Sequence, residues 1–556
     1  MKMLTLLAPL LVSGCFLDET QPHAGSTSPL PDVDGESLGD VPLHGESEPI
    51  EEPEPGWGEP DTMRRLSQRE IIHAFADLYA LDISEDALPQ DNTSFGFEND
   101  RRSQYTTTQL IDASVNLAAE MSARIIDERP EHIPCLEDAE PAVETCLEAL
   151  ITVEGRRLFR RPVTDAHLDE LLQFATDALP EDATYADRVA LTLQAMMVSP
   201  EFLYFIETPA DADASAGATV QADGHTVAAR LASFFWESVP DDVLLDAADD
   251  GTLQTPAGLQ AQVERMVEDP RFRWSQTRFI VHWLHVEKLD ERTKQTADNL
   301  DEALRAAAVE EIDRFVHDVL IAGDAPFSSL FLSTEAVINP RLAALYEVDA
   351  EGDWSVTDLP ERPGLLTRFG FLAAHGHPDR PSPVLRGVTI NNRLFCRDFP
   401  PPPANAESAA AEVADGVSLD QLTNREEYEL TTQQGSCNDC HQLINPPGFA
   451  LEQFDTMGRF RLFEGAALPV NPEATVQELG DVLDATDMME KLAVSPVVQD
   501  CAARHWLRFA AGGARLEDNM PLRGALAEQL AGGLPFGQIA GWIAQQPDFL
   551  TITLPE

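Results

Sequence analysis

The sequence predicts a mainly α-helical protein of several domains. Apolar residues recur at helical spacing along most of the chain, and no segment shows the sustained alternation of apolar and polar residues that predicts strands. The length of 556 residues exceeds what one hydrophobic core usually supports. With 43% hydrophobic and 24% charged residues, the composition excludes a wholly disordered chain, a collagen-like fibre and a multi-span membrane protein.

The chain is strongly acidic. It contains 96 Asp and Glu residues against 38 Lys and Arg residues, which gives a formal net charge of -58 at pH 7. Because binding a nucleic-acid backbone requires a cationic surface, we expect no nucleic-acid partner. We interpret the acidity mainly as an adaptation to a saline habitat, in which salt screens the self-repulsion of such a surface.

The first 15 residues, MKMLTLLAPLLVSGC, predict a signal peptide, because a basic start precedes an apolar run that is too short to span a bilayer. The ending Val12-Ser13-Gly14-Cys15 resembles a bacterial lipobox. This resemblance implies lipidation of Cys15 and export to the cell envelope, with the protein anchored in a membrane and facing the periplasm or the cell surface. Residues 16–61 are rich in Pro, Gly, Ser, Asp and Glu, which predicts a disordered acidic tether.

Helical patterns fill the next two predicted units, the N-terminal helical domains over 62–208 and a central helical domain over 225–350. Ser67 and Glu70 form a capping-box pattern at the start of the first predicted helix. The run 209–224, rich in Ala, Asp and Gly, predicts a linker between the two units. The predicted helices cover 67–80, 108–127, 142–158, 165–178, 186–207, 255–268, 271–287 and 299–321.

The third predicted unit, over 351–466, contains the motif Cys437-Asn438-Asp439-Cys440-His441. This C-x-x-C-H pattern is typical of covalent attachment of haem c, and the unit is therefore predicted to be cytochrome c-like. The two thiols, one helical turn apart, would form thioethers, and the adjacent imidazole of His441 would ligate the iron. Within the unit, 404–416 predicts a loop, and a C-terminal helical domain is expected over 467–556.

The number of cysteines agrees with this interpretation. If Cys15 is lipidated and two thiols hold haem, four cysteines remain for two disulfides, Cys135–Cys146 and Cys396–Cys501, the second pair being inferred only by elimination. Two other interpretations of the motif stay open. It could form a C-x-x-C disulfide beside an incidental histidine, or it could bind zinc with further ligands, of which Cys396 and Cys501 are conceivable examples.

Several further stretches carry a resemblance to a known family. They include 63–70, 155–162, 230–242, 362–367, 382–387, 444–452 and 454–461, in addition to the C-x-x-C-H motif. The chain resembles multi-domain exported proteins of planctomycetes and myxobacteria, which join several domains of unknown function to a planctomycete-type cytochrome c block. The resemblance implies haem c and an envelope location, but no substrate. Position 445 is Asn where Asp is more usual, which we expect to leave haem attachment unaffected.

The sequence leaves the distal iron ligand open. The candidates are Met457, His375 and His377, with Met488, Met489, Met520 and His505 as weaker alternatives. We predict electron transfer or haem-dependent redox chemistry with an envelope redox partner, and no nucleotide cofactor, since the chain has no phosphate-binding glycine loop. The alternative is a haem-free, disulfide-stabilised module that binds an exported protein or polymer.

Overall fold

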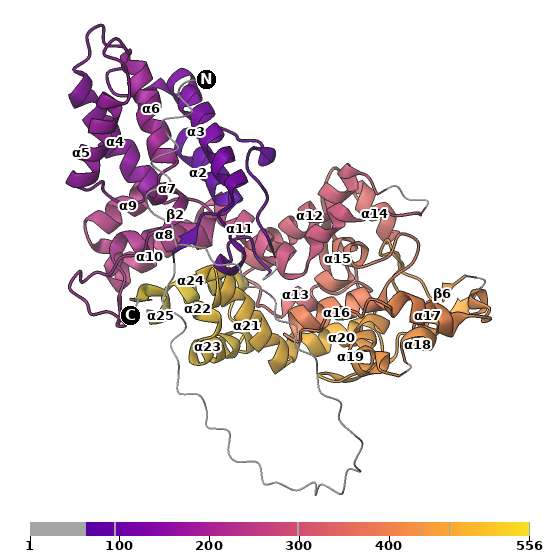
Figure 1. The fold of residues 1–556 in the computed structure, drawn as a ribbon. Helices are drawn as coiled ribbons and strands as arrows, with labels where there is room; N and C mark the ends of the chain where they lie inside the picture. The colour runs from indigo at the N-terminus through magenta and orange to yellow at the C-terminus, as the bar shows by residue number, and fades with distance from the viewer. Residues whose placement is uncertain (1–62, 94–95, 297–299, 434, 466, 555–556) are drawn as a thin grey trace, which may run out of the picture.

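The computed structural model describes residues 63–93, 96–296, 300–433, 435–465 and 467–554. These residues are mainly α-helical, as predicted, and the few strands form two-stranded sheets. The predicted signal peptide, Cys15 and the tether lie outside the described residues. Figure 1 shows the N-terminal helices at one end of the molecule and the segment from α12 to α20 at the other, with the last helices returning between them.

The N-terminal part forms one helical unit with its own hydrophobic core. Its helices are α2 (Gln68–Tyr79), α3 (Thr108–Glu128), α4 (Val143–Phe159), α5 (Asp165–Asp177), α6 (Tyr185–Met197) and α7 (Pro200–Leu203). The helix predicted over 186–207 was too long. Pro200 begins a new helix, capped by the Ser199 hydroxyl, and the antiparallel pair β1 (Arg64–Arg65) and β2 (Tyr204–Phe205) follows.

Two helices predicted in the central part also differ from the structure. The helix predicted over 271–287 ends at Trp283, because His285 adopts a left-handed conformation with φ 55°. The helix predicted over 299–321 continues from α-helix into π-helix. The elements are α8 (Gly224–Trp236), α9 (Asp242–Asp249), α10 (Pro256–Glu268), α11 (Pro270–Trp283), α12 (Glu302–Arg314), η6 (Phe315–Ile321), α13 (Ser329–Leu332), α14 (Pro340–Tyr346) and the paired strands β4 (Glu335–Ile338) and β5 (Ser355–Asp358).

The remaining chain is helical with two short hairpins. Its helices are α15 (Phe369–Ala374), α16 (Pro383–Leu394), α17 (Ala406–Ala414), α18 (Asn424–Thr432), α19 (Cys437–Phe449), α20 (Ala485–Val494), α21 (Pro496–Ala511), α22 (Ala514–Glu517), α23 (Met520–Ala531), α24 (Ile539–Ala544) and α25 (Pro547–Leu550). The hairpins pair β6 (Phe463–Glu464) with β7 (Leu468–Pro469) and β8 (Ala474–Val476) with β9 (Gly480–Val482). The loop predicted over 404–416 was wrong, because its alanines favour helix α17.

Short 3-10 turns connect many of these helices. They are η1 (Glu85–Ala87), η2 (Arg101–Ser103), η3 (Pro130–His132), η4 (Thr252–Gln254), η5 (Val286–Glu291), η7 (Leu365–Thr367), η8 (Leu419–Gln421) and η9 (Phe536–Gln538). The expected linker 209–224 contains β3 (Thr219–Gln221), which pairs antiparallel with β10 (Thr551–Thr553) near the end of the chain. This pairing ties the start of the central part to the last residues of the C-terminal part.

The largest hydrophobic core is shared between the central and C-terminal parts. At its centre, the rings of Phe279 in α11 and Trp506 in α21 stack with centroids 3.9 Å apart, and both are fully buried. A third, smaller core packs α12, α14 and α15 around Met457. Among the described residues, none of the helices is long and apolar enough to cross a membrane.

Candidate functional site

The C-x-x-C-H motif occupies the first turns of α19. Cys437 and Cys440 lie one turn apart, both are partly exposed, and their sulfurs form no bond to one another. In contrast, the other four cysteines of the described chain form the disulfides Cys135–Cys146 and Cys396–Cys501. The site therefore offers two accessible thiols on a rigid helix, and the interpretation of the motif as a C-x-x-C disulfide does not describe this structure.

His441 is oriented by a chain of hydrogen bonds from α19 to α18. Its Nδ1 lies 2.9 Å from Oδ1 of Asn445, one turn further along the same helix. The amide of Asn445 donates to the hydroxyl of Thr432 at 2.8 Å, and that hydroxyl donates to the carbonyl of Tyr428. Because Oδ1 can only accept, Nδ1 carries the proton, and Nε2 presents its lone pair. This tautomer is the one that binds a metal through Nε2.

Close packing against α16 fixes the position of α19. A Cβ atom on Gly387 of α16 would lie 1.7 Å from the carbonyl oxygen of Ile444, and one on Gly448 of α19 would lie 2.0 Å from the carbonyl oxygen of Pro383. Glycine at both positions therefore lets the two backbones touch. This contact gives a physical reason for two stretches of the family resemblance, 382–387 and 444–452.

The second half of α19 contains two prolines, and α16 compensates for one of them. Pro447 has no N–H, so the carbonyl of Leu443 lacks its usual helical donor. The fully buried side chain of Asn391 donates to this carbonyl at 3.0 Å and to its own helix at Gly387. The helix therefore continues through the prolines to Phe449.

Buried charged groups secure the chain that follows α19. Nη1 of Arg386 donates to the carbonyls of Leu451 and Phe454, each at 2.9 Å. The carboxylate of Glu452 accepts from the amide of Asn424 at 3.0 Å and from Arg461 at 3.3 Å. Burial raises the pKa of Glu452.

Asp455 closes a turn in the segment after the motif. Its carboxylate accepts from the backbone N–H groups of Met457 and Arg459. Arg461 pairs with Glu464 at 2.9 Å as well as with Glu452. Side chains of Asp455, Glu452 and Glu464 therefore hold the segment after the motif in place.

The three distal-ligand candidates lie in different environments. Met457 is 1% exposed and belongs to the third hydrophobic core. His375 is equally buried, with Nε2 2.9 Å from the carbonyl of Leu284 and Nδ1 3.3 Å from the hydroxyl of Thr389, and burial lowers its pKa well below the ordinary value. Both ring nitrogens of His375 are thus engaged. Of the three candidates, His377 alone is partly exposed.

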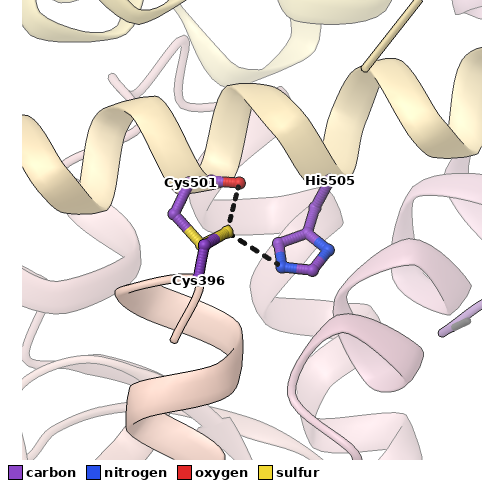
Figure 2. A group of neighbouring side chains, drawn as sticks. All are labelled: Cys396, Cys501 and His505. Carbon is purple, nitrogen blue, oxygen red and sulfur yellow. Dashed lines mark hydrogen bonds between the residues drawn. A yellow bond between two sulfur atoms is a disulfide. The ribbon is translucent and has the colours of Figure 1, made fainter. Parts of the chain in front are cut away.

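Figure 2 shows the one group of described residues that resembles a metal site. The sulfur of Cys396 lies 3.8 Å from Nε2 of His505 on α21. However, Cys396 is bonded to Cys501, so neither sulfur is available as a thiolate. As disulfide partners, Cys396 and Cys501 are also not available as additional zinc ligands for the motif.

Sequence reasoning found the cysteines and His441 but missed the residues that support them. Asn445 follows His441 by four positions, which is one turn of a helix, so its contact with the imidazole ring could have been predicted had a helix been assigned there. The contribution of Asn391 could not, because it depends on how α16 and α19 pack.

Four family models match the chain, each described as a protein of unknown function. They are PSD3 (DUF1587) at residues 64–127, PSD5 (DUF1595) at 146–207, PSD4 (DUF1592) at 223–348 and PSCyt3 (DUF1588) at 362–464. Neither the curated proteins nor the solved structures gave a match. The four matches support a protein of the planctomycete cytochrome-like type, built from adjoining domains of unknown function, with the C-x-x-C-H helix inside the match to PSCyt3.

Proposed function

We propose that this chain binds haem c through Cys437 and Cys440, with His441 as proximal iron ligand, and acts in electron transfer or haem-dependent redox chemistry in the cell envelope. The observation that carries the proposal is the arrangement on α19: two unpaired, accessible thiols one turn apart, followed by a histidine with Nε2 presented. A haem bound here would supply a one-electron iron couple.

The residues of the chain supply the binding and the orientation. The two thiols would attach the group covalently. Asn445 holds the proton on Nδ1 of His441 and fixes the plane of the ring, so that the rotation of the imidazole is set by the protein. The close contact of α16 with α19 keeps this constellation on a rigid element.

We further propose that the protein is exported and anchored through a lipid on Cys15. The C-x-x-C-H motif fits this location, because thiol chemistry of this kind belongs to oxidising compartments, and two other cysteine pairs of the chain are disulfides. The acidic chain of net charge -58 favours a redox partner with a basic docking surface.

The experiment is expression of the chain in a host with c-type maturation machinery, followed by a pyridine haemochrome spectrum of the denatured protein and an intact mass. We expect one covalent haem per chain, which is lost in the double variant Cys437→Ala, Cys440→Ala. The matched control removes the other short-range pair, Cys135→Ala with Cys146→Ala, and should keep the haem. An unmodified mass in the unaltered chain would overturn the proposal in favour of the haem-free interaction module.

A further inference from the structure

A cavity opens beside the β3–β10 pair, where the start of the central part meets the end of the chain. Its volume open to water-sized molecules is about 370 Å³, which lies within the range of about 300–1,000 Å³ that small-molecule sites occupy. Residues of β3, α8, η4, α10 and α25 line it, and Figure 1 shows α10, α24 and α25 close together near the C-terminus. Segments far apart in the sequence therefore form one cavity of the size of a ligand site.

The floor of the cavity is apolar and fixed. It consists of buried side chains that all belong to the largest hydrophobic core, namely Ala222, Val227, Leu253 and Leu259. Because this core is close-packed, the floor keeps its shape without a ligand. An apolar group placed on it would release water from two apolar surfaces, which favours binding.

The rim of the cavity carries the exposed amide side chains of Gln221, Gln254 and Gln545. Nε2 of Gln545 donates to the carbonyl of Gly541 at 3.0 Å, and Nε2 of Gln254 lies 3.5 Å from the carbonyl of Ala222. Because these nitrogens face carbonyls of the chain, the Oε1 atoms of the two amides are the groups left to accept from a ligand. The rim therefore fits a ligand that donates hydrogen bonds.

The lining of the cavity carries no charge. None of the eleven described residues that line it is ionisable, although 24% of the whole chain is charged and its formal net charge is -58. An ionised ligand would lose its contact with water here and gain no partner of opposite charge, which is costly. A neutral ligand meets no such cost, because the rim amides replace its hydrogen bonds to water.

We propose that this cavity binds an uncharged small organic molecule that has an apolar body and a hydroxyl group. The apolar body would lie on the floor, and the hydroxyl would donate to a rim amide. The hydroxyl suits the rim better than a carbonyl does, because a carbonyl oxygen can only accept. This inference is independent of the haem proposal, since no residue of the C-x-x-C-H helix lines the cavity.

The test is an NMR titration of the full chain at pH 7 and constant salt with 2-naphthalenemethanol, whose apolar rings carry one hydroxyl. Two analogues have the same rings but are charged at this pH, 2-naphthoate as an anion and 2-naphthylmethylammonium as a cation. We expect saturable 1:1 binding of the alcohol and binding of each charged analogue that is about tenfold weaker or more. Equally tight binding of the cation would instead assign the binding to the acidic surface of the protein and overturn the proposal.

Val227→Phe places a larger side chain on the floor and should weaken binding of the alcohol about tenfold or more. Val243→Phe is the matched control, because Val243 of α9 is exposed and does not line the cavity. It should bind the alcohol as the unaltered chain does. Far-ultraviolet circular dichroism checks that each variant is folded.

Gln254→Leu carries the test if Val227→Phe does not fold. It keeps a side chain of similar size but removes the amide, so it should weaken binding of the alcohol about threefold or more and leave 2-methylnaphthalene, which has no hydroxyl, unaffected. The proposal is overturned if the alcohol shows no saturable binding, or if folded Val227→Phe or Gln254→Leu binds it as tightly as the unaltered chain.

Discussion

Gly387→Ala tests whether the contact between α16 and α19 positions the C-x-x-C-H helix. The added Cβ would lie 1.7 Å from the carbonyl oxygen of Ile444, whereas real Cβ contacts are essentially never shorter than 3.0 Å. The two helices must therefore move apart by more than an ångström. The obstacle is backbone in the middle of α19, so a change of side-chain rotamer cannot relieve it.

The free energy cost has two parts. Overpacking a close contact of this kind costs about 1–3 kcal/mol or more. Separating the helices also stretches the 3.0 Å hydrogen bond from Asn391 to Leu443, and an unsatisfied buried carbonyl costs about 1–3 kcal/mol. We expect Gly387→Ala to lower the free energy of unfolding by about 3–5 kcal/mol.

The assay is urea unfolding followed by circular dichroism at constant salt, with Gly524→Ala as the matched control. Gly524 lies inside α23, and a Cβ there meets no atom within 4 Å. Alanine at this position should raise stability by about 0.5–1 kcal/mol, because it lowers the entropy of the unfolded chain. Equal unfolding midpoints for the two variants would refute the idea that backbone contact fixes α19.

Three further predictions concern single groups. In the haem-loaded chain, Asn445→Asp should lower the midpoint potential measured in a redox titration, because a charged hydrogen-bond acceptor at Nδ1 makes His441 a stronger donor to the iron. Asn445→Leu removes the acceptor and should raise the midpoint potential. Equal potentials in the two variants would contradict this role of Asn445. Burial alone would raise the pKa of Glu70, but Arg64 lowers it to about 2. The ionised carboxylate therefore stabilises the folded chain above the unfolded pKa of 4.5, and this stabilisation is lost as the pH falls toward 2. Glu70→Gln should therefore lower the free energy of unfolding by about 3 kcal/mol at pH 7, and the stability of this variant should fall less steeply between pH 4.5 and pH 2 than that of the unaltered chain. Acid denaturation curves measure both effects, and an unchanged pH dependence would contradict this role of Glu70. Replacing both Cys396 and Cys501 by Ala should lower the free energy of unfolding by about 4–5 kcal/mol, since this disulfide closes a loop of 105 residues, and unfolding under oxidising conditions measures the loss.

Local signals in the sequence predicted the helices of the N-terminal part and three helices of the central part. The capping box at Ser67 and Glu70 is present in the structure, and the predicted range 67–80 differs by one residue at each end from α2. Errors arose where one residue changes the backbone direction. Pro200 divides the helix predicted over 186–207, and the left-handed conformation of His285 ends α11 earlier than its apolar pattern suggests. The apolar periodicity continues past both points, so it could not reveal them.

The motif of the candidate site could be predicted from the sequence, but the contacts that hold the motif in place could not. C-x-x-C-H identifies the three residues that would bind haem, because the chemistry requires these residue types at this spacing. The donor that Asn391 supplies to Leu443 joins residues 52 positions apart and depends on the packing of α16 against α19. Likewise, Met457 and His375 are plausible ligands by residue type, but one is core packing and the other uses both ring nitrogens in hydrogen bonds.

The arrangement of α21 explains why the units along the chain do not act as separate bodies. Cys501 near its start is bonded to Cys396 just after α16, which packs directly against the C-x-x-C-H helix. Trp506 in its middle stacks on Phe279 of the central part. A single buried helix thus contacts both the structure around the proposed haem site and the central core. Because cores are close-packed, a shift of α21 at any of these contacts must be absorbed at the others. The C-terminal segment therefore serves as the element that joins the other parts, which its position at the end of the sequence does not indicate.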